Sequence, residues 1–229
     1  IDFCAFLYEI DHDDEAIVLL LSSSKDNMDA ICYNRELWHK LFKKQIDRRR
    51  QELFSLDQIF NTQTDPKSRT ALTSIKTQIS KELAYLCTQG IKMADDAIYS
   101  TTKVELACFF QCAKGDFIRY CAETSCGKEQ EELTERCIAL YNSTLSALDM
   151  SLSGSYNQLL ALCLNLSAAL FSLRGDVSAA LSILKSGFSE AIMTFYKLER
   201  ADCQEASFVL NKMAKNITFL NLSGIKQLH

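Results

Sequence analysis

Glycine and proline are scarce in this chain, with seven glycines and one proline among 229 residues. Glycine supplies the positive φ angles that tight turns need, and proline interrupts helices, so a chain poor in both disfavours a turn-rich β architecture. Leu, Ala, Glu, Lys and Gln, which have high helix propensity, are abundant instead. The sequence therefore predicts an all-α fold.

The overall composition excludes several classes of protein. Hydrophobic residues make up 48% of the chain and charged residues 24%, which is ordinary for a globular protein with a sizeable core. A net charge of −4 argues against general nucleic-acid binding. The longest apolar run, 159–173, is interrupted by polar residues and is too short to span a bilayer. Ten cysteines, several in apolar helical contexts, predict reduced thiols and a cytoplasmic location.

Turn signals divide the chain into about nine helical segments. The second segment begins at the acidic run 11–15, and a long third helix is expected over about 27–60. The clearest turn is 61–66, with Asp65 as N-cap and Pro66 at the first helical position. The later segments are expected near 66–99, 104–124, 129–152, 156–173, 177–198 and 202–222.

The connections between these later segments are short, which implies antiparallel neighbouring helices. The predicted stops are Cys126-Gly127, Ser153-Gly154, Arg174-Gly175-Asp176 and 199–202. Because no Pro/Ser-rich linker interrupts the chain, residues 1–229 are predicted to form a single domain. Stacked helix pairs of a solenoid remain an alternative geometry, although no exact repeat is present.

Lys43 and Arg50 stand two helical turns apart, which is about 10.5 Å of rise, and project from nearly one helix face. They belong to the most basic stretch of an acidic protein, 40–50. One interpretation is a solvated face with Asp47 as local partner; another is an anion site, since arginine grips phosphate oxygens bidentately and lysine adds a point charge. RNA binding through this stretch is a third.

Arg119 and Tyr120 are adjacent, so their side chains should leave a helix about 100° apart and flank a ligand. The alternative is an arginine that forms a salt bridge with Asp116 or Glu123, beside a core tyrosine. Asn165 lies within an apolar segment and must find hydrogen-bond partners, either on other helices or on the backbone of an extended peptide. Asn216 presents the same choice.

Four cysteines, Cys108, Cys112, Cys121 and Cys126, suggest zinc, but their spacing fits no common zinc site and no histidine lies nearby. The three histidines are scattered, and no phosphate-binding loop, dinucleotide motif or nucleophile elbow is present. We therefore expect no bound metal, no cofactor and no enzymatic activity.

Four segments together resemble the 14-3-3 protein family. Residues 114–123, Lys-Gly-Asp-Phe-Ile-Arg-Tyr-Cys-Ala-Glu, are similar to the family's fifth-helix motif, and 162–167 to its seventh-helix motif. Residues 216–220 resemble the end of the ninth helix, and Phe42-Lys43 with Arg49-Arg50 the third. The resemblance is strong from about residue 104 onward and weak before residue 30.

This resemblance implies a 14-3-3-like single domain with a concave amphipathic groove and an adaptor that binds phosphoserine or phosphothreonine peptides of client proteins. Residues 1–99 would provide the dimerisation surface and groove floor, and 100–229 the groove wall. The resemblance assigns the phosphate to Lys43, Arg50, Arg119 and Tyr120, and the peptide to Asn165, Asn216, Leu164, Val209 and Phe219. A phosphate-independent helical scaffold for protein contacts is the alternative function.

Some positions depart from the family pattern. Ala168 replaces a larger aliphatic residue, Ser172 a glutamate and Leu220 a tryptophan, while Lys212 stands at a usually apolar wall position. These changes bear on the preferred peptide sequence and leave the phosphate-binding residues in place. The family dimerises through its first four helices. Here Asp11 stands where an interfacial arginine is usual, so a homodimer with an altered interface is expected, with a monomer as the alternative.

Overall fold

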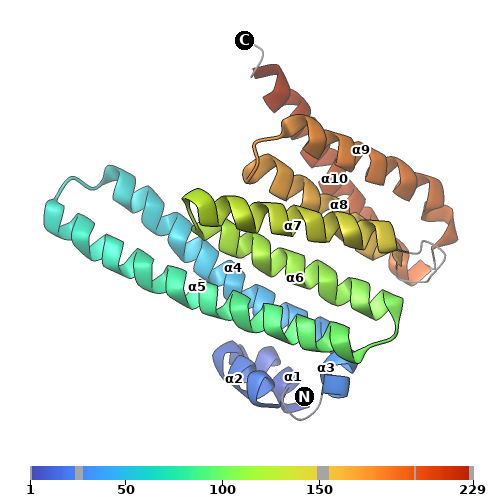
Figure 1. The fold of residues 1–229 in the computed structure, drawn as a ribbon, viewed down its shortest axis with the longest axis horizontal. Coiled ribbons are helices and arrows are strands. Elements are labelled where there is room, and N and C mark those ends of the chain that lie inside the picture. The colour runs from blue at the N-terminus through green and yellow to red at the C-terminus, as the bar shows by residue number, and fades with distance from the viewer. Residues whose placement is uncertain (1, 24–27, 149–154, 199, 227–229) are drawn as a thin grey trace. The chain divides into compact units, whose positions relative to one another are not determined.

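The computed structural model describes residues 2–23, 28–148, 155–198 and 200–226, and these residues form helices and short connections with no strand (Figure 1). The all-α prediction is confirmed. The chain divides into two compact units, Ile1–Ser100 and Thr101–His229. The assignment of 1–99 to the groove floor, of 100–229 to the groove wall and of both to a single domain stays a prediction.

The first unit contains five helices within the residues described. They are α1 (Asp2–Glu9), α2 (Asp13–Ser23), α3 (Met28–Tyr33), α4 (Arg35–Thr62) and α5 (Pro66–Ser100). The long helices α4 and α5 pack against each other, α2 packs on α4, and α3 contacts both α4 and α5. The fully buried side chains of this unit include Leu20, Ile31, Trp38, Leu41, Phe42, Ile46 and Leu83.

The turn between α4 and α5 forms as the sequence predicts. Asp65 accepts a hydrogen bond from the Ser68 backbone N–H at 2.8 Å, which caps α5 at the residue before Pro66. Arg69 donates to the carbonyls of Phe60 and Gln63 and lies 3.9 Å over the Phe60 ring. The first turn of α5 therefore holds the last turn of α4.

The long third helix expected over about 27–60 is instead two helices, α3 and α4, separated at Asn34. The Asn34 side chain donates to the Ala30 carbonyl at 3.1 Å, and its backbone lies at φ −102° and ψ 32°. Short polar side chains that bond back to the preceding turn compete with regular helix geometry, which accounts for the break. The predicted helix start at residue 27 lies outside the described residues.

The link between α1 and α2 is held by a residue of α4. Asp11 adopts a positive φ of 59°, a left-handed conformation that aspartate tolerates better than most residues. Its carboxylate accepts from the Lys44 ammonium at 2.8 Å, and Asp13 pairs with the same ammonium at 2.9 Å. The hydrogen bond from Lys44 lowers the pKa of Asp11. Asp11 is thus engaged within its own chain.

The second unit contains the remaining described helices, which are α6 (Val104–Thr124), α7 (Gly127–Ala147), α8 (Ser155–Ser172), α9 (Val177–Thr194), the short 3-10 helix η1 (Phe195–Lys197) and α10 (Arg200–Lys226). Helix α6 packs on α7, α8 on α9, and α10 on both α8 and α9. The predicted stop at Ser153-Gly154 lies outside the described residues, as does residue 199.

The two described glycine turns of this unit behave differently from each other. Gly175, at φ 71°, ends the connection after α8, and Asp176 then caps α9 by accepting from the Ala179 N–H at 2.9 Å, as expected. Gly127 was expected to close α6, but α6 ends at Thr124 and Gly127, at φ 58°, is the first residue of α7. None of the helices in the described ranges combines the length and the apolarity needed to cross a bilayer.

Candidate functional site

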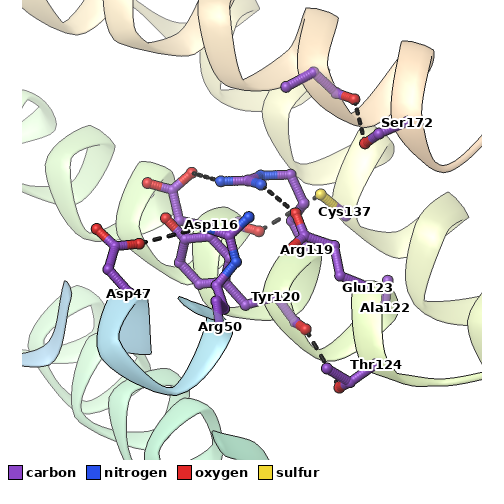
Figure 2. A network of polar contacts seen from close by, with 12 residues as sticks. Asp47, Arg50, Asp116, Arg119, Tyr120, Ala122, Glu123, Thr124, Cys137 and Ser172 are labelled. Atoms are coloured by element: carbon purple, nitrogen blue, oxygen red, sulfur yellow. Dashed lines mark hydrogen bonds and ion pairs between the residues drawn. The ribbon is translucent and has the colours of Figure 1, made fainter. Parts of the chain in front are cut away.

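Lys43 and Arg50 lie on α4 with Asp47 between them. The Lys43 ammonium donates to Asp47 Oδ2 at 2.6 Å, and the Arg50 guanidinium donates to Asp47 Oδ1 at 3.2 Å (Figure 2 shows the Arg50 pair). The two cations therefore project from one face of α4, as their spacing predicts. The interpretation of Asp47 as a local partner of the basic stretch is confirmed.

The opposite face of α4 fixes the orientation of these cations. Phe42 and Ile46 are fully buried, whereas the Lys43 side chain is 48% exposed. Because the apolar residues face the core of the unit, the charged residues beside them are turned toward solvent. The amphipathic character of α4 therefore places the cations on the surface directly from the helix.

The other basic side chains around this site are mostly neutralised. Arg48 pairs with Glu52 at 3.2 Å, Arg49 pairs with Glu82 on α5 at 2.8 Å, and Lys44 is engaged by the α1–α2 link. Carboxylates of the same chain thus pair with these cations, whereas in an RNA-binding stretch the cations would be available to bind phosphates. The ion pairs disfavour the RNA interpretation.

Arg119 lies on α6 in the second unit and is only 8% exposed. Its guanidinium donates to Glu123 at 2.5 Å and lies 4.0 Å from the Asp116 carboxylate (Figure 2). Burial by itself lowers the pKa of Arg119, but the acidic side chains around it outweigh burial, and the pKa is raised above its ordinary value. The Nε of Arg119 is buried and finds no hydrogen-bond partner in the described part of the chain. The salt-bridge interpretation of Arg119 is therefore confirmed.

The sequence predicts that the side chains of Arg119 and Tyr120 diverge, but in the structure they lie against each other. The Arg119 guanidinium lies over the Tyr120 ring, 4.4 Å from its centroid, and the tyrosine is 4% exposed. A cation above an aromatic face is attracted by the ring quadrupole, which offsets the tendency of adjacent side chains to separate. The two side chains are thus stacked as a cation–π pair.

Tyr141 on α7 completes this network, and sequence reasoning did not identify it. Its hydroxyl donates to Asp116 Oδ1 at 2.5 Å, and the side chain is fully buried. Burial, with the Asp116 charge adding to it, raises the pKa of Tyr141, so the hydroxyl stays protonated as a donor. The hydrogen bond holds Asp116 beside Arg119.

Gly115 explains how Tyr141 can approach α6 so closely. A Cβ atom at position 115 would lie 2.4 Å from Tyr141 Cε1, a distance that real Cβ atoms essentially never show. The Lys-Gly-Asp portion of the 114–123 motif therefore has a packing reason: glycine admits the ring that positions Asp116. The sequence shows a glycine within a predicted helix, which is a signal of close packing, but it does not indicate that Tyr141 is the residue packed against it.

The residues expected to contact a peptide lie on α8 and α10, which pack together. Leu164, Asn165, Val209 and Asn216 are half-buried, and Phe219 is 57% exposed, with its ring edge-on to Phe171 at 5.8 Å. Neither asparagine amide hydrogen-bonds to another described residue. Both amides therefore remain able to bond a ligand backbone.

The identity of the chain follows from a comparison with known families. The family model described as 14-3-3 protein matches residues 7–221. The chain belongs to the 14-3-3 family. The resemblance drawn from the four segments is confirmed, and membership supports an adaptor role, which is not enzymatic, in general terms.

The 14-3-3 relatives of this chain are distant. It is 24% identical to the 14-3-3-like protein GF14 epsilon of Arabidopsis thaliana over 209 residues, which cover 90% of this chain and 82% of that protein. It is 22% identical to 14-3-3 protein 7 of Solanum lycopersicum over 209 residues, covering 90% and 83%. It is 23% identical to 14-3-3 protein theta of Gallus gallus over 158 residues, covering 69% and 64%. This is a divergent 14-3-3 protein.

Four of the departures from the 14-3-3 pattern, Ala168, Ser172, Lys212 and Leu220, lie in the second unit. Ser172 is exposed, and its hydroxyl donates to the Ala168 carbonyl at 2.6 Å. Lys212 is exposed on α10, whereas Leu220 is 4% exposed and packs into the unit. The surface of α10 near the expected peptide residues is accordingly more polar than a wholly apolar wall.

This 14-3-3 protein shows no cluster of three or more potential metal ligands among the described residues. Burial raises the pKa of Cys163 to about 11 and that of Cys137 to about 12, so both thiols are protonated at neutral pH. Metal coordination needs the thiolate. Cys137 and Cys163 therefore act as buried apolar packing residues.

The structure thus groups the four residues expected to bind phosphate into two pairs. Lys43 and Arg50 share Asp47 on α4, and Arg119 is stacked on Tyr120 in α6. The two pairs belong to different units, and their convergence on one phosphate stays a prediction.

Proposed function

We propose that this protein is an adaptor that binds phosphoserine or phosphothreonine peptides of client proteins, and that Lys43, Arg50, Arg119 and Tyr120 together hold the phosphate. The observation that carries the proposal is Arg119, a buried arginine stacked on a tyrosine, in a chain whose 14-3-3 match spans residues 7–221. A buried guanidinium with an unused N–H is a costly feature that a bound anion would satisfy.

The chemistry suits a phosphate dianion. Arginine offers a planar fork of donors, lysine a point charge, and tyrosine a neutral hydroxyl donor, and charge-assisted hydrogen bonds are about twice as strong as neutral ones. The α4 pair presents its cations at the solvent-facing side of a rigid helix, and the α6 pair is fixed by Asp116 and Glu123. Preorganised donors lose little entropy when the ligand binds.

The extended peptide would lie along α8 and α10. The Asn165 and Asn216 amides each combine a donor with an acceptor, which is the pattern needed to pair with a peptide backbone unit. Leu164, Val209 and Phe219 supply the apolar side. Lys212 adds a positive charge there, so we propose a preference for acidic or polar residues at the ligand position that meets it.

A phosphate-independent scaffold is the second candidate, and one observation favours it. Asp47 already binds both α4 cations, and Glu123 already binds Arg119, so each cationic group carries an internal carboxylate. Clients would then bind through the apolar and amide residues of α8 and α10 without any phosphate.

Fluorescence anisotropy separates the two candidates. A labelled peptide of the form Arg-Ser-x-phosphoSer-x-Pro is compared with its unphosphorylated twin, and the adaptor proposal expects binding of the phosphopeptide alone, at micromolar affinity or tighter. Arg119→Lys should weaken binding about tenfold or more, since the bidentate fork is lost. Arg136→Lys, which makes the same change at an exposed arginine of α7, is the matched control. Equal affinity for the two peptides would establish the scaffold instead.

We also propose a homodimer formed through the first unit, and a cytoplasmic location. Phe3 and Phe6 of α1 stack at 6.0 Å and are 60% and 50% exposed, and such apolar surface commonly marks an interface. Sedimentation velocity of the wild type and of Phe3→Ser/Phe6→Ser should show the dimer and its loss. A fluorescent fusion tests the location.

A further inference from the structure

Asp47 is the residue of α4 that distinguishes this site from a simple pair of cations. It lies four residues after Lys43 and three residues before Arg50, which are the two spacings that bring helical side chains into contact. Each of its carboxylate oxygens serves one cation, Oδ2 at 2.6 Å from Lys43 and Oδ1 at 3.2 Å from Arg50. The carboxylate thus occupies both cations at once, as a phosphate would.

We propose that Asp47 is an internal competitor for the phosphate-binding cations, so that a phosphopeptide must displace its carboxylate before Lys43 and Arg50 can bind the phosphate. This inference rests on the proposed function, because it concerns the same site. It assigns Asp47 the role of setting the affinity of the site, and sequence reasoning had treated Asp47 only as a neutralising partner.

The exposure of the three side chains supports displacement. Asp47 is 34% exposed, Arg50 35% and Lys43 48%, so solvent can rehydrate the carboxylate when it leaves. Exposed ion pairs contribute little to stability and therefore exchange readily. Glu123 differs, since it binds a cation that is almost fully buried, and its departure would leave Arg119 short of a partner in a poorly solvated place.

The competition has two physical components. The phosphate must replace two charge-assisted hydrogen bonds, and the displaced carboxylate then remains close to a dianion of the same sign. Asp47→Asn removes the repulsion and weakens the competing hydrogen bonds, because the amide keeps one neutral acceptor oxygen in place of two charged ones, and the side chain keeps the same shape. Asp47→Asn should therefore lower the phosphopeptide Kd about threefold to tenfold, which is ~0.7–1.4 kcal/mol.

The experiment measures the Kd of the labelled phosphopeptide by fluorescence anisotropy for the full chain and two variants. Asp47→Asn is the test. Glu52→Gln is the control, because it removes one negative charge from the same helix where that charge pairs with Arg48 at 3.2 Å instead of with Lys43 or Arg50. Thermal unfolding verifies that both variants fold as the wild type does.

The outcomes distinguish the inference from the function on which it rests. Tighter binding by Asp47→Asn with an unchanged Kd for Glu52→Gln supports the inference, and binding that is detected only in Asp47→Asn supports it more strongly. If the wild type binds and Asp47→Asn binds equally or more weakly, Asp47 orders the cations or is a bystander, and the inference is overturned while the adaptor function stands. If neither protein binds the phosphopeptide at millimolar concentration, both are overturned.

Discussion

Gly115→Ala should destabilise the second unit, although helix propensity alone predicts the opposite. Alanine is about 1 kcal/mol more favourable than glycine within a helix. At position 115, however, the new Cβ would lie 2.4 Å from Tyr141 Cε1 and 2.9 Å from Cδ1. The Tyr141 ring is fully buried and its hydroxyl is bonded to Asp116, so it cannot rotate away without losing that bond.

The size of the effect follows from these contacts. Overpacking of a filled core costs about 1–3 kcal/mol. Loss of a hydrogen bond to a charged acceptor costs about 1.5–3 kcal/mol. After the gain in helix propensity, we expect Gly115→Ala to be ~2–5 kcal/mol less stable than the wild type. Release of Asp116 also removes the group that faces the Arg119 guanidinium at 4.0 Å, so phosphopeptide binding should weaken as well.

Urea unfolding followed by far-UV circular dichroism measures this loss. Ala139→Gly, at an exposed position of α7, calibrates the propensity difference in this protein and should cost about 1 kcal/mol. Tyr141→Leu completes a double-mutant cycle, because a smaller side chain makes room for the methyl group. We expect a coupling of about 1 kcal/mol or more between the two positions. A neutral or stabilising Gly115→Ala, or strict additivity with Tyr141→Leu, would refute the packing argument.

Three further predictions concern caps, a carboxylate and a buried phenol. Asp65→Ala and Asp176→Ala each remove an N-cap acceptor, and each should lower the free energy of unfolding by about 1 kcal/mol. Asn at either position can still cap the helix, so it should keep most of the wild-type stability. The pKa of Glu82 is lowered, chiefly by the hydrogen bond from Gln78 and further by Arg49, so its stabilisation is present above its unfolded pKa and is lost as pH falls through the folded pKa. Acid unfolding of Glu82→Gln should lack this part of the pH dependence below about pH 4.5, and an identical acid profile would contradict the assignment. Tyr156→Phe removes a hydroxyl that donates to the Ala191 carbonyl at 2.9 Å, and a loss of about 1 kcal/mol in urea unfolding is expected, with no loss at all counting against this bond.

The position of most helices and their N-caps could be predicted from local sequence, whereas contacts between residues far apart in the chain could not. The Asp65–Pro66 helix start and the 104–124 helix follow from caps and spacing, and both are present. The break at Asn34 was missed because a single asparagine within an otherwise helical pattern gives a weak signal. Tyr141 was missed for another reason: it lies 25 residues from Asp116, and no local pattern relates the two.

The candidate site shows the same division. Asp47 lies within a helical turn of both its cations, so spacing alone indicated it as a partner. The stacking of Arg119 on Tyr120 depends on burial of both side chains, which spacing does not report, and spacing favoured divergence. Convergence of the α4 and α6 pairs depends on how two units meet, and residue spacing within either unit carries no information about it.

The α4 cations and Arg119 of α6 are stabilised in different ways, and this difference determines how each could contribute to phosphate binding. Arg119 is held in a buried network by Glu123, Asp116 and the Tyr120 ring, so its position is set before any ligand arrives. The α4 cations both pair with the partly exposed carboxylate of Asp47. A phosphate that binds both pairs would therefore add to the buried network but replace the exposed one. If the proposed site is correct, we expect a substitution at Asp47 to change its affinity without disturbing a core.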